Sequence, residues 1–396
     1  MIKLNKKNIV FNNNNYIPIS KNKIYNKIIL TKNLKIVFLL IFIFIFISFF
    51  IIKFFIINER NYKLENSNLS KQSIETNIIN DEFLKNLKNI IKSDDDIIKN
   101  ELLSKHTTFK LGGPAKFFIR PKTVNQIIEI IKICNKYKIH YFILGNGSNI
   151  LVSDAGFNGV IIQIHEKYFS NLEVRKEDEK NFNLIVGGGM LMKTLSIEAC
   201  LLSLTGLEDI IDIPGTVGGG IIMNASYKYT GLTNSLIKVK AITPEGVLIE
   251  LTKEECGLSH RGSILKTKKY IVIEATFKLQ NGDQIIIQKT MTNNTKKRYE
   301  KQPMYFGSAG CFFIWDHNKN GGMYEKYKES NLVSYRVGNV MIYTYNIAFI
   351  VNLGGGTAKQ VMEIVKFIEK IMKEKYKIEI KREVIVIGSF NNTEYY

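Results

Sequence analysis

One cysteine stands in a loop of small residues, in the stretch GSAGCFFIW at residues 307–315. Small residues precede Cys311 and aromatic residues follow it. The other three cysteines, Cys134, Cys200 and Cys256, are far apart, form no CxxC pair and lie in apolar surroundings typical of core packing. The pattern indicates neither a metal site nor a disulfide framework. From the residues alone, Cys311 is either a small packed side chain or a reactive thiol.

Three glycine-rich stretches follow strand-like runs, at residues 110–115, 144–154 and 213–225. Glycine permits left-handed backbone and lets N–H groups converge on phosphate oxygens, so a pyrophosphate cofactor is one explanation. Three ordinary turns are the other. None of the stretches ends in Gly-Lys-Ser/Thr, and none has the GxGxxG spacing of a Rossmann site.

The elements that position these loops are predicted from the periodicity of the apolar residues. Thr123 is expected to cap a helix whose apolar face includes Ile127, Ile131 and Cys134. Strands are predicted at 115–121, 140–144, 159–164 and 183–189, a helix at 191–204, and a hairpin at 236–251 that turns at Pro244-Glu245-Gly246. Residues 348–388 read as strand, glycine-rich turn, helix and strand. The predicted fold class is α+β.

The N-terminal region differs from the rest in composition. Residues 1–35 are basic, rich in Lys, Asn and Ile, and contain no acidic residue. Residues 36–57 are strongly hydrophobic and predict a transmembrane or targeting segment. Residues 58–105 read as a polar linker with a helical patch that runs from about residue 81 to residue 103.

The 396 residues carry a net charge of +19, of which the first 60 residues contribute +9 through nine Lys and one Arg against one Glu. Lys, Asn and Ile are abundant throughout, so a compositional bias explains the charge. No cluster of basic residues with interleaved aromatic residues predicts a nucleic-acid surface. The charge alone selects no partner.

Seven motifs in order resemble UDP-N-acetylenolpyruvoylglucosamine reductase, the MurB family of flavoenzymes in peptidoglycan precursor synthesis. They are HTTFKLGGPAKFF, LGNGSNILVSDAGFNGVII, GLEDIIDIPGTVGGGIIMNA, HRGSIL, KQPMYFGSAGCFF, FIVNLGGGTAKQV and EIKREVIVIG. The resemblance runs from about residue 103 to residue 388, and the form of the KQP…SAGC motif is similar to the type II branch.

The resemblance implies a PCMH-type FAD-binding domain at about 106–280 and a smaller α+β substrate-binding domain at about 290–388. It implies FAD as cofactor and NADPH as the reductant that UDP-GlcNAc-enolpyruvate then replaces. The cofactor-binding residues it implies are Gly112, Gly113, Leu144, Gly145, Asn146, Gly147, Ser148, Asn149, Ile213, Pro214, Gly215, Thr216, Gly218, Gly219 and Asn224.

The resemblance also assigns chemistry to three side chains. Hydride addition to the enolpyruvyl double bond leaves negative charge beside a carboxylate, and Arg261 matches the family's guanidinium that stabilises it. Cys311 matches the serine or cysteine that donates the proton, and Glu383 matches a carboxyl group at the substrate's carboxylate. Arg261 favours the thiolate of Cys311 and burial opposes it. We expect burial to prevail.

Several positions depart from the family pattern. Ile314, Trp315 and Asp316 stand where the family commonly has Lys, then Asn or Arg, then Pro, which help to bind the substrate's diphosphate. We expect weaker substrate binding, with Lys319 as a possible replacement cation. His260 replaces a tyrosine, Asn346 begins a stretch that usually reads His-Ala-Asn-Phe, and NASYKY replaces a more glycine-rich run.

Two alternatives stay open beside the reductase. One is another PCMH-type FAD oxidoreductase, and the other is a membrane-tethered flavin-binding protein that has lost catalysis. Because the substrate and NADPH are cytosolic, we expect a cytoplasmic location, and separately we expect a monomer. Residues 36–57 would then form a tether, be removed, or not belong to the working protein.

Overall fold

The computed structural model of the chain describes residue 34 and residues 37–51, 53–54, 57–59, 81–227, 230–390 and 393–395. Its contacts divide into two units, Met1–Ile78 and Ile79–Tyr396. Residues 37–51 of the first unit are helical. Within the described residues, no helix combines the length and the apolar character needed to cross a bilayer. The transmembrane or targeting segment predicted for residues 36–57 stays a prediction, because residues 36, 52, 55 and 56 lie outside the described residues. The predicted basic tail lies outside the described residues, apart from residue 34.

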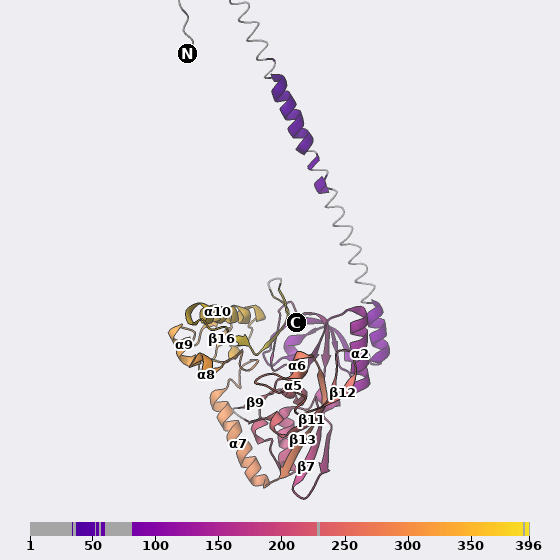
Figure 1. Ribbon diagram of the computed structural model, residues 1–396, viewed down its shortest axis with the longest axis vertical. Helices are drawn as coiled ribbons and strands as arrows, with labels where there is room; N and C mark the ends of the chain where they lie inside the picture. Colours follow the sequence, from indigo (N-terminus) through magenta and orange to yellow (C-terminus); the bar gives the residue numbers. More distant parts are fainter. Residues whose placement is uncertain are drawn as a thin grey trace, which may run out of the picture. The chain divides into compact units, whose positions relative to one another are not determined.

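The second unit contains a four-stranded sheet in the order β1-β2-β5-β3, in which β5 runs parallel to β2 and β3. The strands are β1 (Ile97–Leu102), β2 (Pro114–Ile119), β3 (Tyr141–Leu144) and β5 (Phe157–Gln163). α2 (Val124–Tyr137) packs beside it (Figure 1). As predicted, Thr123 caps α2, because its hydroxyl accepts a hydrogen bond from the Gln126 N–H.

The helical patch predicted for residues 81–103 is only half helical. Residues 81–90 form the helix, and they bury Phe83 and Leu87 in the core that α2 shares. The helix is followed by the 3-10 turn Asp94–Asp96, and the chain continues as β1, which pairs with β2. Aspartate is a poor helix former, and three in a row favour a break. The prediction of a continuous helix was wrong from residue 91 onward.

A second, larger sheet has the order β12-β11-β13-β7-β6, with β8 also paired to β13. Its strands are β6 (Leu172–Lys176), β7 (Asn181–Gly187), β8 (Leu204–Thr205), β11 (Leu236–Ile242), β12 (Leu248–Thr252) and β13 (Ile271–Asn281). The β11–β12 hairpin is confirmed. α4 (Met192–Leu201) and α5 (Val217–Ile222) pack in the same core.

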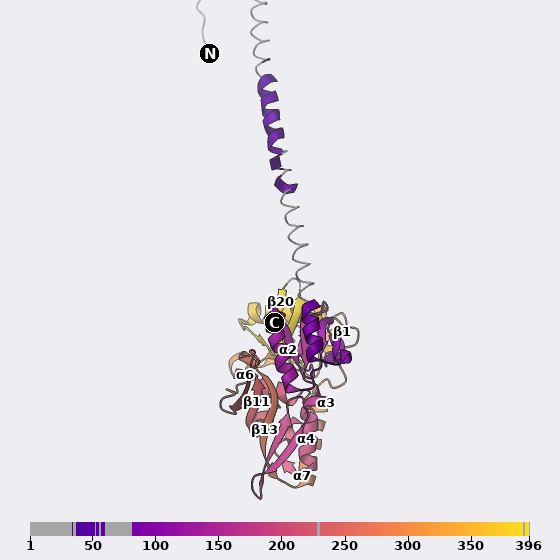
Figure 2. The ribbon, with the colours of Figure 1, turned by 90° about the vertical axis from the view of Figure 1, so that its right-hand side faces the viewer.

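Short elements fill the connections around this sheet. They are α3 (Glu166–Phe169), the 3-10 turns Glu208–Ile210 and Leu232–Ser235, the pair β9 (Ser226–Tyr227) and β10 (Thr230–Gly231), and α6 (Ile264–Thr267). α7 (Gln284–Lys301) lies beside α4 (Figure 2) and leads the chain toward its C-terminal part.

The C-terminal part gathers three helices around a small sheet, and these helices lie together in Figure 1. The helices are α8 (His317–Asn320), α9 (Met323–Glu329) and α10 (Ala358–Tyr376). The sheet has the order β15-β16-β17, with β15 (Arg336–Val337), β16 (Val340–Ile342) and β17 (Ile350–Asn352). The pair β14 (Phe313–Ile314) and β18 (Lys381–Arg382) completes this part.

The end of the chain returns to the first part of the unit. β19 (Ile385–Phe390) runs parallel to β4 (Ile150–Val152) and antiparallel to β20 (Thr393–Tyr395). The carboxylate of Asp154, just beyond β4, accepts hydrogen bonds at 2.8 Å from the N–H groups of Ala358 and Lys359 at the start of α10. These contacts connect the end of β4 with the start of α10, more than 200 residues later in the chain.

Candidate active site

A cavity of about 700 Å³ lies where the second and third glycine loops meet the C-terminal part of the unit. Arg261, Cys311 and Glu383 come from three separate segments and all line it. Most of the predicted cofactor residues line it as well: Leu144, Gly145, Asn146, Gly147, Ser148, Asn149, Ile213, Pro214, Gly215, Thr216 and Gly219. The volume lies in the range of cofactor and small-molecule sites.

Ser148 and Pro214 connect the two glycine loops, because the Ser148 hydroxyl donates to the Pro214 carbonyl oxygen at 3.1 Å. Gly215 has a φ of +128°, a region that favours glycine, and a Cβ there would lie 3.0 Å from the Ser148 Oγ. The Thr216 hydroxyl then caps α5 by accepting from the Gly219 N–H. The two loops therefore line one wall of the cavity largely with backbone.

Four predicted cofactor residues do not line the cavity, namely Gly112, Gly113, Gly218 and Asn224. The Gly113 N–H donates to the Ser153 carbonyl oxygen at 2.8 Å, and a Cβ at Gly113 would come within 2.1 Å of the Asp154 carbonyl oxygen. The Gly218 N–H likewise donates to a backbone carbonyl oxygen, that of Gly188. The structure places these glycines in close backbone packing, so Gly112, Gly113 and Gly218 lie outside the cavity wall.

Arg261 stands in a tight turn in which Ser259 and Gly262 exchange backbone hydrogen bonds at 2.9 and 3.2 Å. Asn224 anchors this turn, because its side-chain amide donates to the Ser259 carbonyl oxygen at 2.8 Å. The guanidinium donates through Nη1 to the Ser226 hydroxyl at 3.1 Å and through Nη2 to the Ser226 carbonyl oxygen at 3.4 Å. Both Asn224 and Ser226 thus hold the arginine in place.

Glu383 lies between β18 and β19, and its Oε1 is 3.0 Å from the Nε of Arg261. The two side chains are only 16% and 21% exposed, so this ion pair is shielded from most of the solvent. The Glu383 N–H donates to the carbonyl oxygen of Phe312, the neighbour of Cys311, at 2.9 Å. The Asn149 amide donates to the Glu383 carbonyl oxygen at 3.3 Å. A glycine loop, the thiol loop and Glu383 are therefore tied together through backbone contacts.

Burial dominates the electrostatics of the two ionisable groups beside Arg261. It raises the pKa of the Cys311 thiol to about 11, helped by the negative charge of Glu383 and opposed by Arg261 and Arg298. Burial also raises the pKa of Glu383, although Arg261 and Lys266 oppose the rise. Cys311 keeps a partial opening to the cavity. We expected burial to outweigh the charge of Arg261 at the Cys311 thiol, and the raised pKa of Cys311 agrees with this expectation.

Arg298 is a second guanidinium at the cavity, and no sequence motif indicated it. It is 4% exposed, lines the cavity, and donates through Nη2 to the Gln302 Oε1 at 3.0 Å. Arg298 belongs to the run KKRYEKQP near the end of α7, which has the composition of a solvated helix face. A buried arginine is rare, and only the packing of α7 reveals it.

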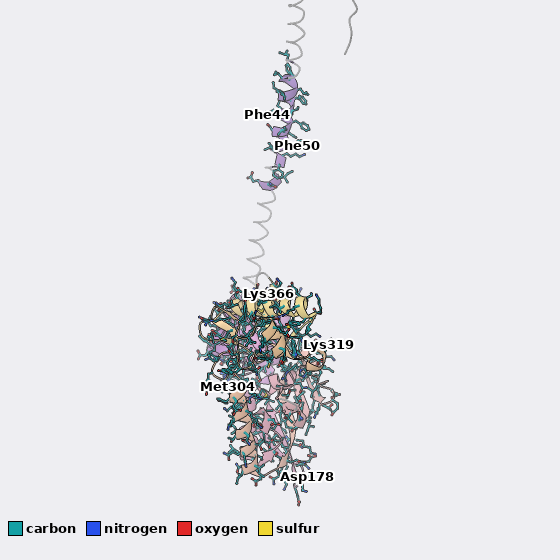
Figure 3. The ribbon with its side chains drawn as sticks, turned by 90° about the vertical axis from the view of Figure 1, so that its left-hand side faces the viewer. Phe44, Phe50, Asp178, Met304, Lys319 and Lys366 are labelled. Carbon is teal, nitrogen blue, oxygen red and sulfur yellow. The ribbon has the colours of Figure 1, made fainter. Side chains whose placement is uncertain are left out.

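The residues after Cys311 do not reach the cavity. Ile314, Trp315 and Asp316 are absent from its wall. Trp315 is 9% exposed in the C-terminal core, and its indole N–H donates to the Gly321 carbonyl oxygen. Lys319 does not line the cavity either, and Figure 3 places it toward the opposite edge of the unit from Met304, which does. The expectation that Lys319 replaces the missing cation is therefore not supported. Asn346 does line the cavity.

Comparisons with known proteins agree with this arrangement. Residues 115–252 match the family model of an FAD binding domain, and residues 302–387 match that of the UDP-N-acetylenolpyruvoylglucosamine reductase C-terminal domain. A UDP-N-acetylenolpyruvoylglucosamine reductase of Lachnoclostridium phytofermentans is 36% identical over 314 residues, which cover 78% of this chain and 98% of that protein. One from Clostridium novyi is 36% identical over 320 residues and is covered to 98%.

A solved structure is similar as well. The crystal structure of UDP-N-acetylenolpyruvylglucosamine reductase (MurB) from Thermus caldophilus has a TM-score of 0.61 and 29% sequence identity, over 73% of this chain and 99% of that chain. With the cavity, the two matched domains and relatives aligned over almost their whole length, this chain belongs to the UDP-N-acetylenolpyruvoylglucosamine reductase (MurB) family.

Proposed function

We propose that this chain reduces the enolpyruvyl group of UDP-GlcNAc-enolpyruvate to the lactyl ether of UDP-N-acetylmuramate, with NADPH as reductant and FAD as cofactor. The observation that carries the proposal is the meeting of Arg261, Cys311 and Glu383 in the cavity that the glycine loops also line. A guanidinium, a protonated thiol and a carboxyl group are the side chains that saturation of an enol ether beside a carboxylate requires.

The cavity fits a flavin nucleotide. Its volume of about 700 Å³ suits a large cofactor, and the glycine loops leave backbone rather than side chains along one wall. The loops at residues 144–149 and 213–216 would hold the cofactor, and bound FAD supplies the hydride that it has received from NADPH. Gly112, Gly113 and Gly218 would act indirectly by holding neighbouring backbone segments.

Arg261 supplies permanent positive charge at the cavity wall. Its Nε lies against Glu383 and its Nη1 against Ser226, so the orientation of the guanidinium is set before a substrate enters. Because arginine stays protonated at all relevant pH values, it stabilises the negative charge that develops next to the substrate's carboxylate. Pre-organisation of this kind is worth most in a site that excludes water.

Cys311 delivers the proton. With its pKa at about 11, the thiol keeps its hydrogen at neutral pH, and it lines the same cavity as Arg261. The S–H bond breaks as a C–H bond forms at the carbon next to the carboxylate, and the thiolate is reprotonated from solvent. Glu383, whose pKa is also raised, favours its protonated form more than an exposed glutamate does and can share a proton with a substrate carboxylate.

The test separates flavin reduction from product formation. Purified protein should be yellow, and NADPH should bleach the flavin. Cys311→Ala should still bleach but form no product, whereas Cys311→Ser should retain measurable turnover because a hydroxyl also carries a proton. Product formation by the alanine variant at the wild-type rate would remove Cys311 as the proton donor. A protein that binds no FAD would overturn the whole proposal.

Because NADPH and UDP-sugars are cytosolic compounds, we also propose a cytoplasmic location.

A further inference from the structure

Aromatic side chains are unusually exposed around the cavity. Tyr305 is 85% exposed and Phe306 is 42% exposed, and both line the cavity. Tyr345 is 80% exposed and directly precedes Asn346, another lining residue. Large aromatic residues that face solvent beside a binding cavity carry apolar surface that folding leaves uncovered. Their position therefore indicates contact with a ligand rather than with the protein core.

Ring contacts through Tyr343 join Phe306 to Tyr345 and so connect two loops, whereas the ring of Tyr305 lies 6.2 Å from that of Tyr299. The ring of Phe306 lies 6.2 Å from that of Tyr343, and the ring of Tyr343 lies 5.6 Å from that of Tyr345, measured between centroids. We call Tyr305, Phe306, Tyr343 and Tyr345 the aromatic rim. Separations of this size are typical of interacting aromatic pairs, so Phe306, Tyr343 and Tyr345 pack against one another.

A cation stands at the same cavity. Lys110 lines the cavity, and the segment that carries it is attached to the loop of the aromatic rim, because the Thr108 hydroxyl donates to the Ser308 carbonyl oxygen at 2.7 Å. Ser308 is two residues beyond Phe306. The wall thus combines flat aromatic surface with a lysine, which are the two features that recognise a base and its phosphates.

Residues 312–316, which directly follow Cys311, supply no cation to the cavity. Trp315 is buried in the C-terminal core, and Asp316 accepts a hydrogen bond from the Lys319 N–H in the first turn of α8. Neither lines the cavity. A substrate whose reacting end lies at Cys311 must extend its nucleoside diphosphate elsewhere along the wall.

We propose that the aromatic rim binds the uracil base of the UDP-sugar substrate and that Lys110 contacts its diphosphate. The proposal rests on the proposed function, since it takes the ligand to be a uridine nucleotide. It assigns a binding site to residues outside the catalytic set and makes substrate affinity, rather than chemistry, depend on them.

The experiment compares UDP with inorganic pyrophosphate as probes of the FAD-loaded enzyme. Titration calorimetry should show that Tyr305→Ala combined with Tyr345→Ala weakens UDP binding roughly tenfold, the scale of one base–aromatic stacking contact. Pyrophosphate binding should be unchanged, because pyrophosphate has no base.

Lys110→Ala should weaken the binding of both UDP and pyrophosphate. Tyr305→Phe with Tyr345→Phe should restore UDP binding, since the stacking surface remains. Tyr324→Ala, which removes a 52% exposed tyrosine of α9 that does not line the cavity, is the matched control.

Kinetics supply the second measurement. The double alanine variant should raise the KM for UDP-GlcNAc-enolpyruvate and leave both kcat and flavin reduction by NADPH near wild type. Unchanged UDP affinity in that variant would overturn the inference, as would an equal loss of pyrophosphate affinity. If the double alanine variant showed slower flavin reduction by NADPH but intact UDP binding, the aromatic rim would bind the pyridine nucleotide instead. That result would also overturn the inference. Failure of the proposed function looks different, because the wild-type enzyme itself would then form no product.

Discussion

The Nε of Arg261 and the Oε1 of Glu383 lie 3.0 Å apart, and this contact joins two segments more than 120 residues apart in the sequence. The other two guanidinium nitrogens of Arg261 donate to Ser226, while the carboxyl group of Glu383 lies where burial disfavours its charge. This one contact therefore brings together a fixed cation and a carboxyl group with a raised pKa, which are the two groups that the proposed reaction uses.

Replacing Glu383 by glutamine should change how stability depends on pH. The pKa of Glu383 is raised in the folded protein, so its favourable contribution is full below the unfolded pKa and is lost as pH rises through the folded pKa. Glutamine does not titrate. The stability of Glu383→Gln relative to wild type should therefore improve as pH rises from about 4, the usual pKa of an unfolded glutamate, until it passes the raised folded pKa. Thermal unfolding at saturating FAD measures it, and a relative stability that falls with pH would contradict the raised pKa.

The pKa of Cys311 predicts a pH profile for the protonation step. A thiol two pH units below a pKa of about 11 is still about 99% protonated, so the step should keep its rate up to about pH 9 and then fall. Stopped-flow mixing of the reduced enzyme with the substrate isolates this step. In Cys311→Ser the decline should move to higher pH, because a hydroxyl is a weaker acid. An identical decline in both proteins would show that another group titrates.

Ser226 should behave as a positioning residue for Arg261. Ser226→Ala removes the hydroxyl that accepts from Nη1, and we expect a loss of about tenfold in kcat, the usual effect of one hydrogen bond to a charged group. NADPH should still reduce the flavin at the wild-type rate. Ser226→Thr keeps the acceptor and should recover most of the turnover. A threonine variant as slow as the alanine variant would mean that the hydroxyl does not act through Arg261.

Gly215 should be needed for flavin binding more than for folding. Gly215→Ala places a Cβ in a backbone with φ of +128° and 3.0 Å from the Ser148 Oγ, at the contact between the two glycine loops. Gly354→Ala is the matched control, since its φ is +111° but a Cβ there meets nothing within 4 Å. Both variants should lose stability, by roughly 1–3 kcal/mol. Only Gly215→Ala should lose bound FAD, measured from the ratio of flavin to protein absorbance.

Local signals predicted much of the fold correctly. The hydroxyl of Thr123 caps the N-terminus of α2. The hydroxyl of Thr357 caps that of α10 in a capping box with Gln360, as residue type and spacing predict. The hairpin at Gly246, with its φ of +79°, follows equally from sequence. These features depend on neighbours within a few residues, which a single sequence contains.

Features set by distant partners were not predictable in this way. Gly113 has the same local signature as the cavity glycines, but its role follows from the approach of Asp154, some 40 residues away. Arg298 reads as a surface residue until α7 packs beside the second sheet. The contact of Ser226 with Arg261 likewise depends on a turn 35 residues later. The three catalytic candidates came from family resemblance, because no spacing rule joins residues 261, 311 and 383.

The parallel pairing of β19 with β4 has a consequence for biogenesis. Glu383 stands two residues before β19, and β4 is synthesised more than 230 residues earlier, so the ribosome must release nearly the entire polypeptide before the acid can meet its arginine. A chain that ends shortly before residue 383, through arrested translation or proteolysis, lacks β19. Its β4 then has an unpaired edge that can pair with a strand of another chain.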